Sequence, residues 1–243
     1  ALAEKLRRIE EVSRRLKLAE SKDELYEIVL EAVNKVLGFT YAAIMEAQED
    51  ALVVIKHRGY PPELAGRRLP FAEGKGVTVA AFLTNVPVYV PDVKKEPRYV
   101  AGLPLARCEL AIPISVGERK FGVLNIEHDA PDGINAEEQD LLKILAAELG
   151  VALLGLERLH RLENLGQKLI ALHALSQKLQ RCQTQEEVCQ TAVEGIVEAL
   201  GFDQANVGLG QNDVLVPAAC VGMLGRKGRP FKKGEGIAGK TWA

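Results

Sequence analysis

Three polar side chains near the middle of the chain have the types and spacing to bind a small polar molecule. Residues 108–116 and 120–128 are predicted to form two neighbouring strands joined by a short turn. Alternation along both strands places Glu109, Asn125 and Glu127 on one side of this hairpin. That polar side is either solvated or lines a cavity beneath the loop of residues 91–107. The opposite side is apolar and is predicted to be covered by helices; it carries Leu110, Ile112, Leu124 and Ile126.

The loop of residues 91–107 supplies three further candidate ligand-binding residues. A long irregular connection is often a functional lid, and Asp92, Tyr99 and Arg107 lie in this one. Arg107 and Glu109 carry opposite charges close together in the sequence. They either hold a zwitterionic or polar metabolite together or pair with each other at the rim of the site. The candidate ligand-binding residues are therefore Asp92, Tyr99, Arg107, Glu109, Asn125 and Glu127.

The cysteines and histidines predict neither a metal site nor a catalytic nucleophile. Cys108, Cys182, Cys189 and Cys220 form no short paired motif, and the four histidines are scattered. Cys108 begins a strand on its apolar side, so we expect it to be a small core residue. Free thiols are typical of a reducing cytoplasm, which is the expected location. The cofactor is unknown from the sequence.

The composition is that of an ordinary globular protein. The chain has 243 residues, 47% of them hydrophobic, and a formal net charge of −2. Because it carries no basic excess, contact with nucleic acid is not expected. No apolar run approaches the roughly 20 residues of a membrane span, so no membrane contact is expected either.

The elements that must position the polar residues form an α+β pattern. Helices are predicted over residues 2–19 and 21–37, the second capped by Ser21. Strands follow at 41–47 and 52–58, then an irregular segment at 59–75, a short helix at 76–84 and a strand at 86–90. After the lid and the central hairpin, a capping box at residues 135–138 opens the last helix. This order indicates an antiparallel sheet with the terminal helices on one face.

The last helix is unusually long. Residues 137–180 contain no proline, and their leucines recur in steps of three and four. A run of this length suggests a partner helix as well as a domain core, although two kinked helices are the alternative. The predicted dimer residues are Leu156, Leu159, Leu162, Leu165, Leu169 and Leu172.

The sequence also repeats with a period near 163 residues, and the second copy begins within this helix. Leu165 to Leu179 align with Leu2 to Leu16, and a second capping box at residues 184–187 aligns with residues 21–24. Gly234-Glu-Gly236 and Trp242 align with Gly74-Lys-Gly76 and Phe82 after a short gap. Tandem domains are expected, with boundaries at 1–20 (helix), 21–158 (first domain), 159–182 (connecting helix) and 183–243 (second domain). Because nothing after Ala243 matches residues 86–128, the second domain is expected to be incomplete and the chain a fragment.

Several short motifs make the chain resemble the GAF family of small-molecule sensor domains. They include Val88-Tyr-Val-Pro-Asp92, Cys108-Glu-Leu-Ala-Ile-Pro-Ile114 and Phe121-Gly-Val-Leu-Asn-Ile126, with Gly234-Glu-Gly-Ile-Ala-Gly239 in the second copy. The resemblance implies a six-stranded antiparallel sheet with a ligand pocket between the sheet and the lid. It also implies parallel helices that form a homodimer and signal to a C-terminal effector outside this chain, such as a histidine kinase, a nucleotide cyclase or a transcription regulator.

The resemblance favours a regulatory sensor over an enzyme. Family members that reduce free methionine sulfoxide use lid cysteines, and residues 91–107 contain none. The same lack argues against a covalent bilin, and the cyclic-nucleotide signature matches poorly. Two alternatives to the sensor remain. The first is a ligand-free dimerisation and relay module, and the second is a cysteine-dependent methionine sulfoxide reductase. The ligand itself cannot be named from the sequence.

Overall fold

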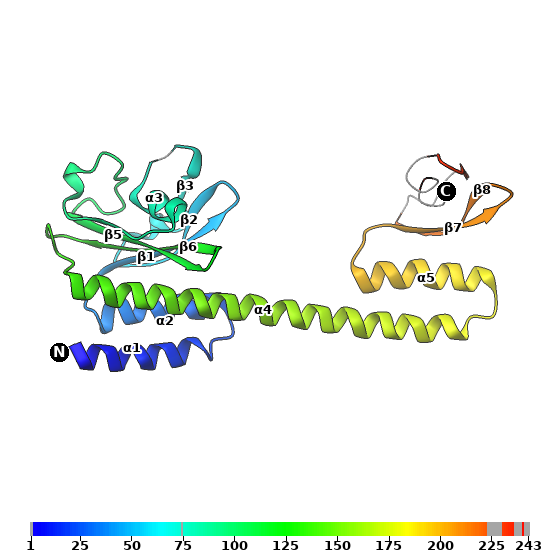
Figure 1. The fold of residues 1–243 in the computed structure, drawn as a ribbon, viewed down its shortest axis with the longest axis horizontal. Coiled ribbons are helices and arrows are strands. Elements are labelled where there is room, and N and C mark those ends of the chain that lie inside the picture. Colours follow the sequence, from blue (N-terminus) through cyan, green and yellow to red (C-terminus); the bar gives the residue numbers. More distant parts are fainter. Residues whose placement is uncertain (1, 74, 223–229, 236–239, 241–243) are drawn as a thin grey trace. The chain divides into compact units, whose positions relative to one another are not determined.

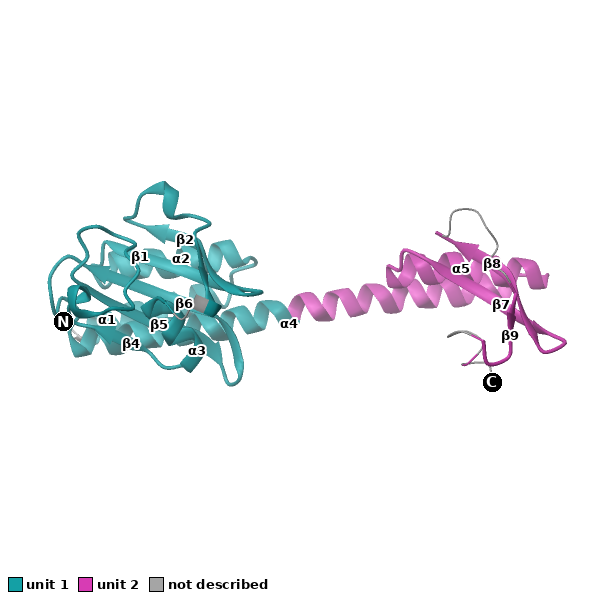
Figure 2. Cartoon of the chain, turned by 90° about the horizontal axis from the view of Figure 1, so that it is seen from above, with its two compact units in different colours: residues 1–158 teal, residues 159–243 magenta. Residues whose placement is uncertain are grey.

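A computed structural model describes residues 2–73, 75–222, 230–235 and 240. The chain divides into two compact units, residues 1–158 and 159–243 (Figure 2). No helix in the described ranges combines the length and the apolar character that a membrane span requires. The predicted glycine motifs at 74–76 and 234–239 and the predicted match of Trp242 fall partly or wholly outside the described residues.

Two of the first four helices begin where their predicted caps place them. Helix α1 spans Leu2–Leu16 and α2 spans Lys22–Lys35. The Ser21 hydroxyl accepts a hydrogen bond from the Glu24 backbone N–H, which satisfies one of the free donors at the start of α2. Helix α3 spans Val77–Thr84, and α4 runs without a break over Ala136–Arg181. Asn135 and Glu138 exchange side-chain to backbone hydrogen bonds before α4, so the predicted capping box is confirmed.

A six-stranded antiparallel sheet forms the centre of this unit (Figure 1). The strands are β1 Tyr41–Gln48, β2 Ala51–Arg58, β3 Arg68–Pro70, β4 Val88–Val90, β5 Cys108–Val116 and β6 Arg119–His128. Their order is β3-β2-β1-β6-β5-β4, and every pair is antiparallel. The predicted α+β class and the antiparallel sheet are therefore confirmed.

The segment at 59–75 is more ordered than the sequence predicts. It contains the edge strand β3 and two short 3-10 helices, Pro62–Leu64 and Phe71–Glu73. A third 3-10 helix, Val93–Lys95, lies in the predicted lid. Each of these elements has three residues, so none is long enough to show a hydrophobic period in the sequence.

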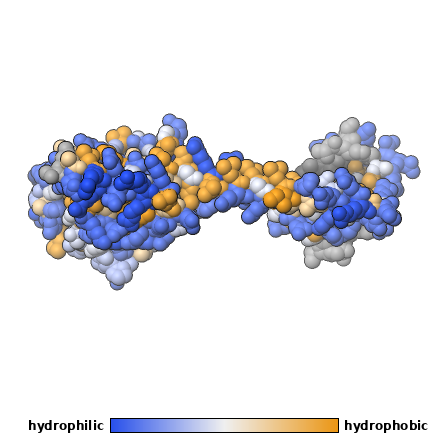
Figure 3. Space-filling view, turned by 90° about the horizontal axis from the view of Figure 1, so that it is seen from below, coloured by the Kyte–Doolittle hydropathy of each residue, from blue (hydrophilic) through white to orange (hydrophobic). Residues whose placement is uncertain are grey.

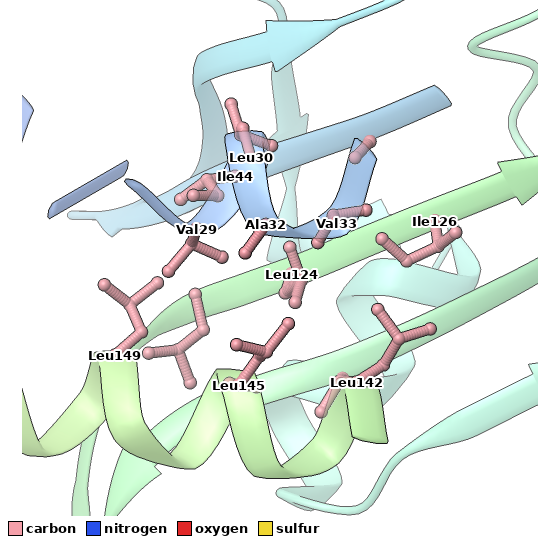
Figure 4. Close-up of a cluster of buried hydrophobic side chains, with 14 of the residues drawn as sticks. Val29, Leu30, Ala32, Val33, Ile44, Leu124, Ile126, Leu142, Leu145 and Leu149 are labelled. Atoms are coloured by element: carbon pink, nitrogen blue, oxygen red, sulfur yellow. The ribbon is translucent and has the colours of Figure 1, made fainter. Parts of the chain in front are cut away.

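One face of the sheet packs against α2 and α4. Figure 4 shows Val29 and Val33 of α2 and Leu145 of α4 converging on Leu124 of β6. All four side chains are fully buried in one cluster. The predicted helix-facing residues all belong to this cluster: Leu110, Ile112, Leu124 and Ile126. The alternation of the central hairpin therefore correctly assigned its apolar face.

The other face of the sheet carries the lid and α3 (Figure 1). A second cluster of buried side chains lies here, including Ala43 and Met45 of β1 and Ala111 of β5. Gly122 fits the close approach of β6 to β1, since a Cβ at this position would lie 1.8 Å from the Met45 carbonyl oxygen. The candidate site lies on this side of the sheet.

The described residues of the second unit form the later part of α4, helix α5 Gln185–Leu200 and three strands. The strands are β7 Ala205–Gln211, β8 Val214–Val221 and β9 Phe231–Lys232. Thr184 and Glu187 form the predicted capping box before α5, and Gly201 ends that helix at φ 74°. The division into a connecting helix and a second domain copy stays a prediction.

Leucines of α4 between its two packed ends are exposed. Leu156 and Leu175 are buried. The exposed set between them is Leu159 (52%), Leu162 (66%), Leu165 (50%), Leu169 (66%) and Leu172 (38%). Figure 3 shows hydrophobic atoms gathered along this stretch of α4.

Candidate functional site

The polar side of the central hairpin is buried, so its interpretation as a solvated face is wrong. Only 4% of Glu109, 8% of Asn125 and 2% of Glu127 is exposed. These three residues line one cavity together with residues of β1, β2, α3 and the loops beside β3. The complete lining is Ala43, Met45, Val54, Tyr60, Leu64, Arg67, Leu69, Thr78, Val100, Gly102, Glu109, Asn125 and Glu127.

The cavity is small and partly open. The space available to the centre of a water-sized molecule is about 40 Å³, and the whole empty space, including the open mouth, is about 390 Å³. A single water needs roughly 10–15 Å³ on the first scale, so the enclosed part has room for a few waters or a molecule of a few heavy atoms. This is smaller than a typical pocket for a drug-sized ligand.

Strand register brings the two carboxyl groups together. Glu109 of β5 is the Cα partner of Glu127 of β6, and Ala111 is the partner of Asn125. Directly opposite residues on one face of an antiparallel pair have their Cβ atoms about 4.5–5.5 Å apart. Two acidic side chains at this spacing repel each other when both are ionised.

The hydrogen bonds at the site are incomplete. The Tyr99 hydroxyl of the lid donates to Glu127 Oε1 at 2.6 Å. Glu127 Oε2, Glu109 Oε2, Asn125 Oδ1 and the Tyr60 hydroxyl are buried and have no hydrogen-bond partner within the described part of the chain. Buried polar atoms are normally paired, so four such atoms around one cavity make it a candidate binding site.

Burial changes the acidity of both glutamates. Loss of hydration raises the pKa of Glu109 well above its usual range, and the charge of Glu127 raises it further, while the Asn125 side chain opposes this shift. Burial also raises the pKa of Glu127, against the opposing effects of the Tyr99 and Tyr60 hydroxyls and the Arg67 charge. The pair therefore favours a state in which it holds a proton.

The tip of the lid, at Ala101 and Gly102, covers the cavity. Arg67, before β3, donates from Nη1 to the Ala101 carbonyl at 2.7 Å. A Cβ at Gly102 would lie 3.2 Å from Glu127 Oε2 and 3.5 Å from Tyr60 Cε1. The absence of a side chain at Gly102 therefore lets the lid backbone approach the carboxyl group closely.

Asp92 and Arg107 lie apart from the other candidate residues. Asp92 caps the 3-10 helix Val93–Lys95 by accepting from the Lys94 N–H at 3.2 Å. Arg107 Nη2 lies 3.6 Å from Asp92 Oδ1, and neither residue lines the cavity. Arg107 thus pairs with Asp92, and the predicted rim pair of Arg107 with Glu109 is wrong. Their predicted role as ligand contacts stays a prediction, and the geometry gives them a structural role at the base of the lid.

Sequence reasoning did not identify Tyr60, Arg67 and Thr78 as cavity residues. Tyr60 and Arg67 come from the segment predicted to be irregular, and Thr78 lies in the first turn of α3. Thr78 is only 3% exposed. A polar residue at the start of an otherwise apolar helix was the available signal for Thr78, whereas only tertiary structure brings Tyr60 and Arg67 to the site.

Cys108, the cysteine of the first unit, does not line the cavity. Cys108 is fully buried in the cluster on the helix side of the sheet, and burial raises the pKa of its thiol. Its predicted role as a core residue is confirmed. No group of side chains able to hold a metal ion occurs among the described residues.

Comparison with known proteins places this fold in a family. A family profile described as GAF domain matches residues 19–154. A bacteriophytochrome from R. palustris is similar with a TM-score of 0.65 and 16% identity, covering 85% of this chain and 48% of its own. A putative GAF sensor protein from Burkholderia vietnamiensis gives a TM-score of 0.54 and 20% identity, covering 61% of this chain and 93% of its own.

An enzyme shares the fold as well. The free methionine-R-sulfoxide reductase from Neisseria meningitidis, solved in complex with its substrate, gives a TM-score of 0.55 and 21% identity, covering 60% of this chain and 86% of its own. No curated protein matches the chain by sequence. At these identities the solved structures establish the fold alone. The profile match covers more than half of the 243 residues, and the chain belongs to the GAF domain family.

Proposed function

We propose that the first unit is a regulatory small-molecule sensor. The observation that carries this proposal is the buried cavity under the lid, where four polar atoms have no hydrogen-bond partner within the described part of the chain. Leaving a buried acceptor or donor unpaired costs about 1–3 kcal/mol, and a ligand that pairs these atoms recovers that free energy. The relationship to a putative GAF sensor protein supports the same function.

Helix α4 is the proposed route of the signal. Its first turns pack through Leu142, Leu145 and Leu149 on the sheet whose other face lines the cavity (Figure 4). The same helix continues to Arg181 with a row of exposed leucines. We propose that these leucines form a parallel homodimer seam and that tandem domains are joined through it to an effector. A coupling of roughly 1–3 kcal/mol between pocket and seam is enough for such a relay.

The proposed relay ends at an effector C-terminal to α4. A histidine kinase, a nucleotide cyclase or a transcription regulator would each accept a signal from a dimeric helix. We place the protein in the cytoplasm on the basis of its unpaired cysteines.

Native mass spectrometry of the protein purified from its host tests the sensor function. We expect a retained small molecule, and loss of that molecule in an Ala43→Leu variant that fills the cavity from β1. A matched control, Ala42→Val, changes the neighbouring position on the helix side of the same strand. Retention of the same molecule by Ala43→Leu would show that it binds elsewhere.

Light scattering tests the dimer seam. Leu162 and Leu169 are seven residues apart and both are 66% exposed, so they lie on one side of α4. Replacing both by serine should convert a dimer into a monomer at micromolar concentration. The control replaces Leu18 and Leu105, which are 80% and 69% exposed but lie outside α4. A wild-type protein that is monomeric would remove the seam from the proposal.

Two other functions give different results. A ligand-free relay module would dimerise through α4 but retain no molecule. A methionine sulfoxide reductase would need a reactive thiol beside the cavity, whereas Cys108 is buried on the opposite face of the sheet. Sulfoxide turnover that persists at pH 7 and disappears on Cys108→Ala would favour the reductase.

A further inference from the structure

The cavity contains more hydrogen-bond acceptors than donors. Glu109 Oε2, Glu127 Oε2 and Asn125 Oδ1 are unpaired acceptors when the carboxyls are ionised, and each belongs to a side chain more than nine-tenths buried. Of the donors nearby, the Tyr60 hydroxyl is unpaired and two others are engaged. The Tyr99 hydroxyl bonds to Glu127, and Arg67 bonds to the Ala101 carbonyl.

An occupant that satisfies these atoms must supply donors and positive charge. A carboxylate or phosphate would face two glutamates at short range, and burying like charges together is strongly unfavourable. A neutral alcohol supplies a single proton for three acceptors. A primary ammonium supplies three donors and one positive charge, which matches the three oxygens.

We propose that the cavity binds a small organic cation through a primary ammonium group, with Glu109 and Glu127 as its counter-charges and Asn125 as the third acceptor. This inference rests on the proposed sensor function and names the chemical class of its ligand. Apolar side chains complete the lining and receive a short hydrocarbon part of the ligand; these include Ala43, Met45, Val54, Leu64 and Leu69.

The charges of the site fit one cation. Two ionised glutamates and the Arg67 guanidinium at the mouth leave a net charge of −1, which a single ammonium neutralises. The enclosed space of about 40 Å³ limits the ligand to a few heavy atoms. A monoamine therefore fits better than a longer polyamine.

Binding of the cation should release a proton. Without a cation opposite them, the buried carboxyl pair favours a protonated state, because burial raises the pKa of both residues. An ammonium stabilises the ionised form, so the proton leaves as the cation enters. The titratable and charged groups that face this pair from the surrounding elements are Tyr60, Arg67, Glu96 and Tyr99.

Titration calorimetry with three probes of equal length tests the ligand class. Propylamine should bind to the purified protein at least tenfold more tightly than 1-propanol, and propionate should not bind. Between pH 6 and pH 8, propylamine affinity should rise by up to about tenfold per pH unit for one released proton. Buffers with different ionisation enthalpies should give a proton release of up to one per ligand.

Glu109→Gln is the decisive variant. Its amide has nearly the same shape but cannot ionise, so propylamine affinity should fall at least tenfold and its pH dependence should become shallower. Glu118→Gln, at the exposed turn between β5 and β6, is the matched control and should bind as wild type does. If Glu109→Gln does not fold, judged by circular dichroism, Glu127→Gln answers the same question.

The outcomes separate this inference from the sensor function. Binding of 1-propanol or propionate that equals or exceeds that of propylamine overturns the cation, yet leaves a ligand-binding cavity. Failure of all three probes overturns the cation too; a retained neutral or anionic molecule in native mass spectrometry would then still support the sensor. Failure of the probes with no retained molecule refutes both.

Discussion

The unfolding free energy of the first unit should decrease as pH rises, because the carboxyl group of Glu109 is buried beside that of Glu127. Burial raises the pKa of Glu109 well above its usual range, and Glu127 adds to this effect. In the unfolded chain the same carboxyl has a pKa of about 4.3. At a pH above 4.3 but below the raised pKa of the folded state, the folded chain holds a proton that the unfolded chain has released. The unfolding free energy is therefore greatest at the acid end of this pH range.

The size of the effect follows from proton counting. For each proton that only the folded state holds, a rise of one pH unit lowers the unfolding free energy by up to about 1.4 kcal/mol. One shared proton on the Glu109–Glu127 pair therefore predicts a loss of up to about 2.7 kcal/mol between pH 5 and pH 7. Glu109→Gln has no proton to lose at this position, so most of this dependence should disappear and the variant should be more stable than wild type at pH 7.

Hydrogen exchange of the central hairpin tests this prediction, because it measures the free energy of opening within the first unit alone. Peptides covering β5 and β6 report the free energy of opening once intrinsic exchange rates are corrected for pH. Glu118→Gln should follow the wild-type curve, because residue 118 is exposed in the turn. Parallel curves for wild type and Glu109→Gln would refute the reasoning, since the buried carboxyl would then not bind the extra proton.

Three further substitutions test how the site is held. Leu124→Ala removes a fully buried side chain between the sheet and two helices and should cost about 2–5 kcal/mol in urea unfolding. Ser21→Ala removes the hydroxyl that accepts from the Glu24 N–H and should cost about 1 kcal/mol; Ser21→Asp should restore most of it. Gly122→Ala would place a Cβ 1.8 Å from the Met45 carbonyl oxygen, so exchange protection of β1 and β6 should fall. Unchanged protection would mean that the two strands can separate without loss of pairing.

Local patterns in the sequence were sufficient for most of the elements. Ser21, Asn135 and Thr184 cap the helices that they were predicted to start, because a cap involves only residues three or four positions apart. The strands β5 and β6 followed from alternation, since side chains of a strand point in turn to its two faces. The short elements between β2 and α3 carried no such period and were missed.

The candidate site was predictable only in part. Alternation correctly grouped Glu109, Asn125 and Glu127, but it could not show whether water or the lid covered them. The pairing of Arg107 with Asp92 depends on where the lid begins and ends. The position of Arg67 in the lining of the cavity depends on the path of the chain around β3. Neither position has a local signal.

The sequence by itself therefore determined the class of the fold, the two faces of its central hairpin and the starts of its capped helices, because these depend on neighbours along the chain. Tertiary structure decided what the polar face does. Register places Glu109 opposite Glu127, and the lid removes water from both. Contacts between residues far apart in the sequence convert two ordinary glutamates into a buried pair whose pKa values are raised, and no local pattern encodes that change.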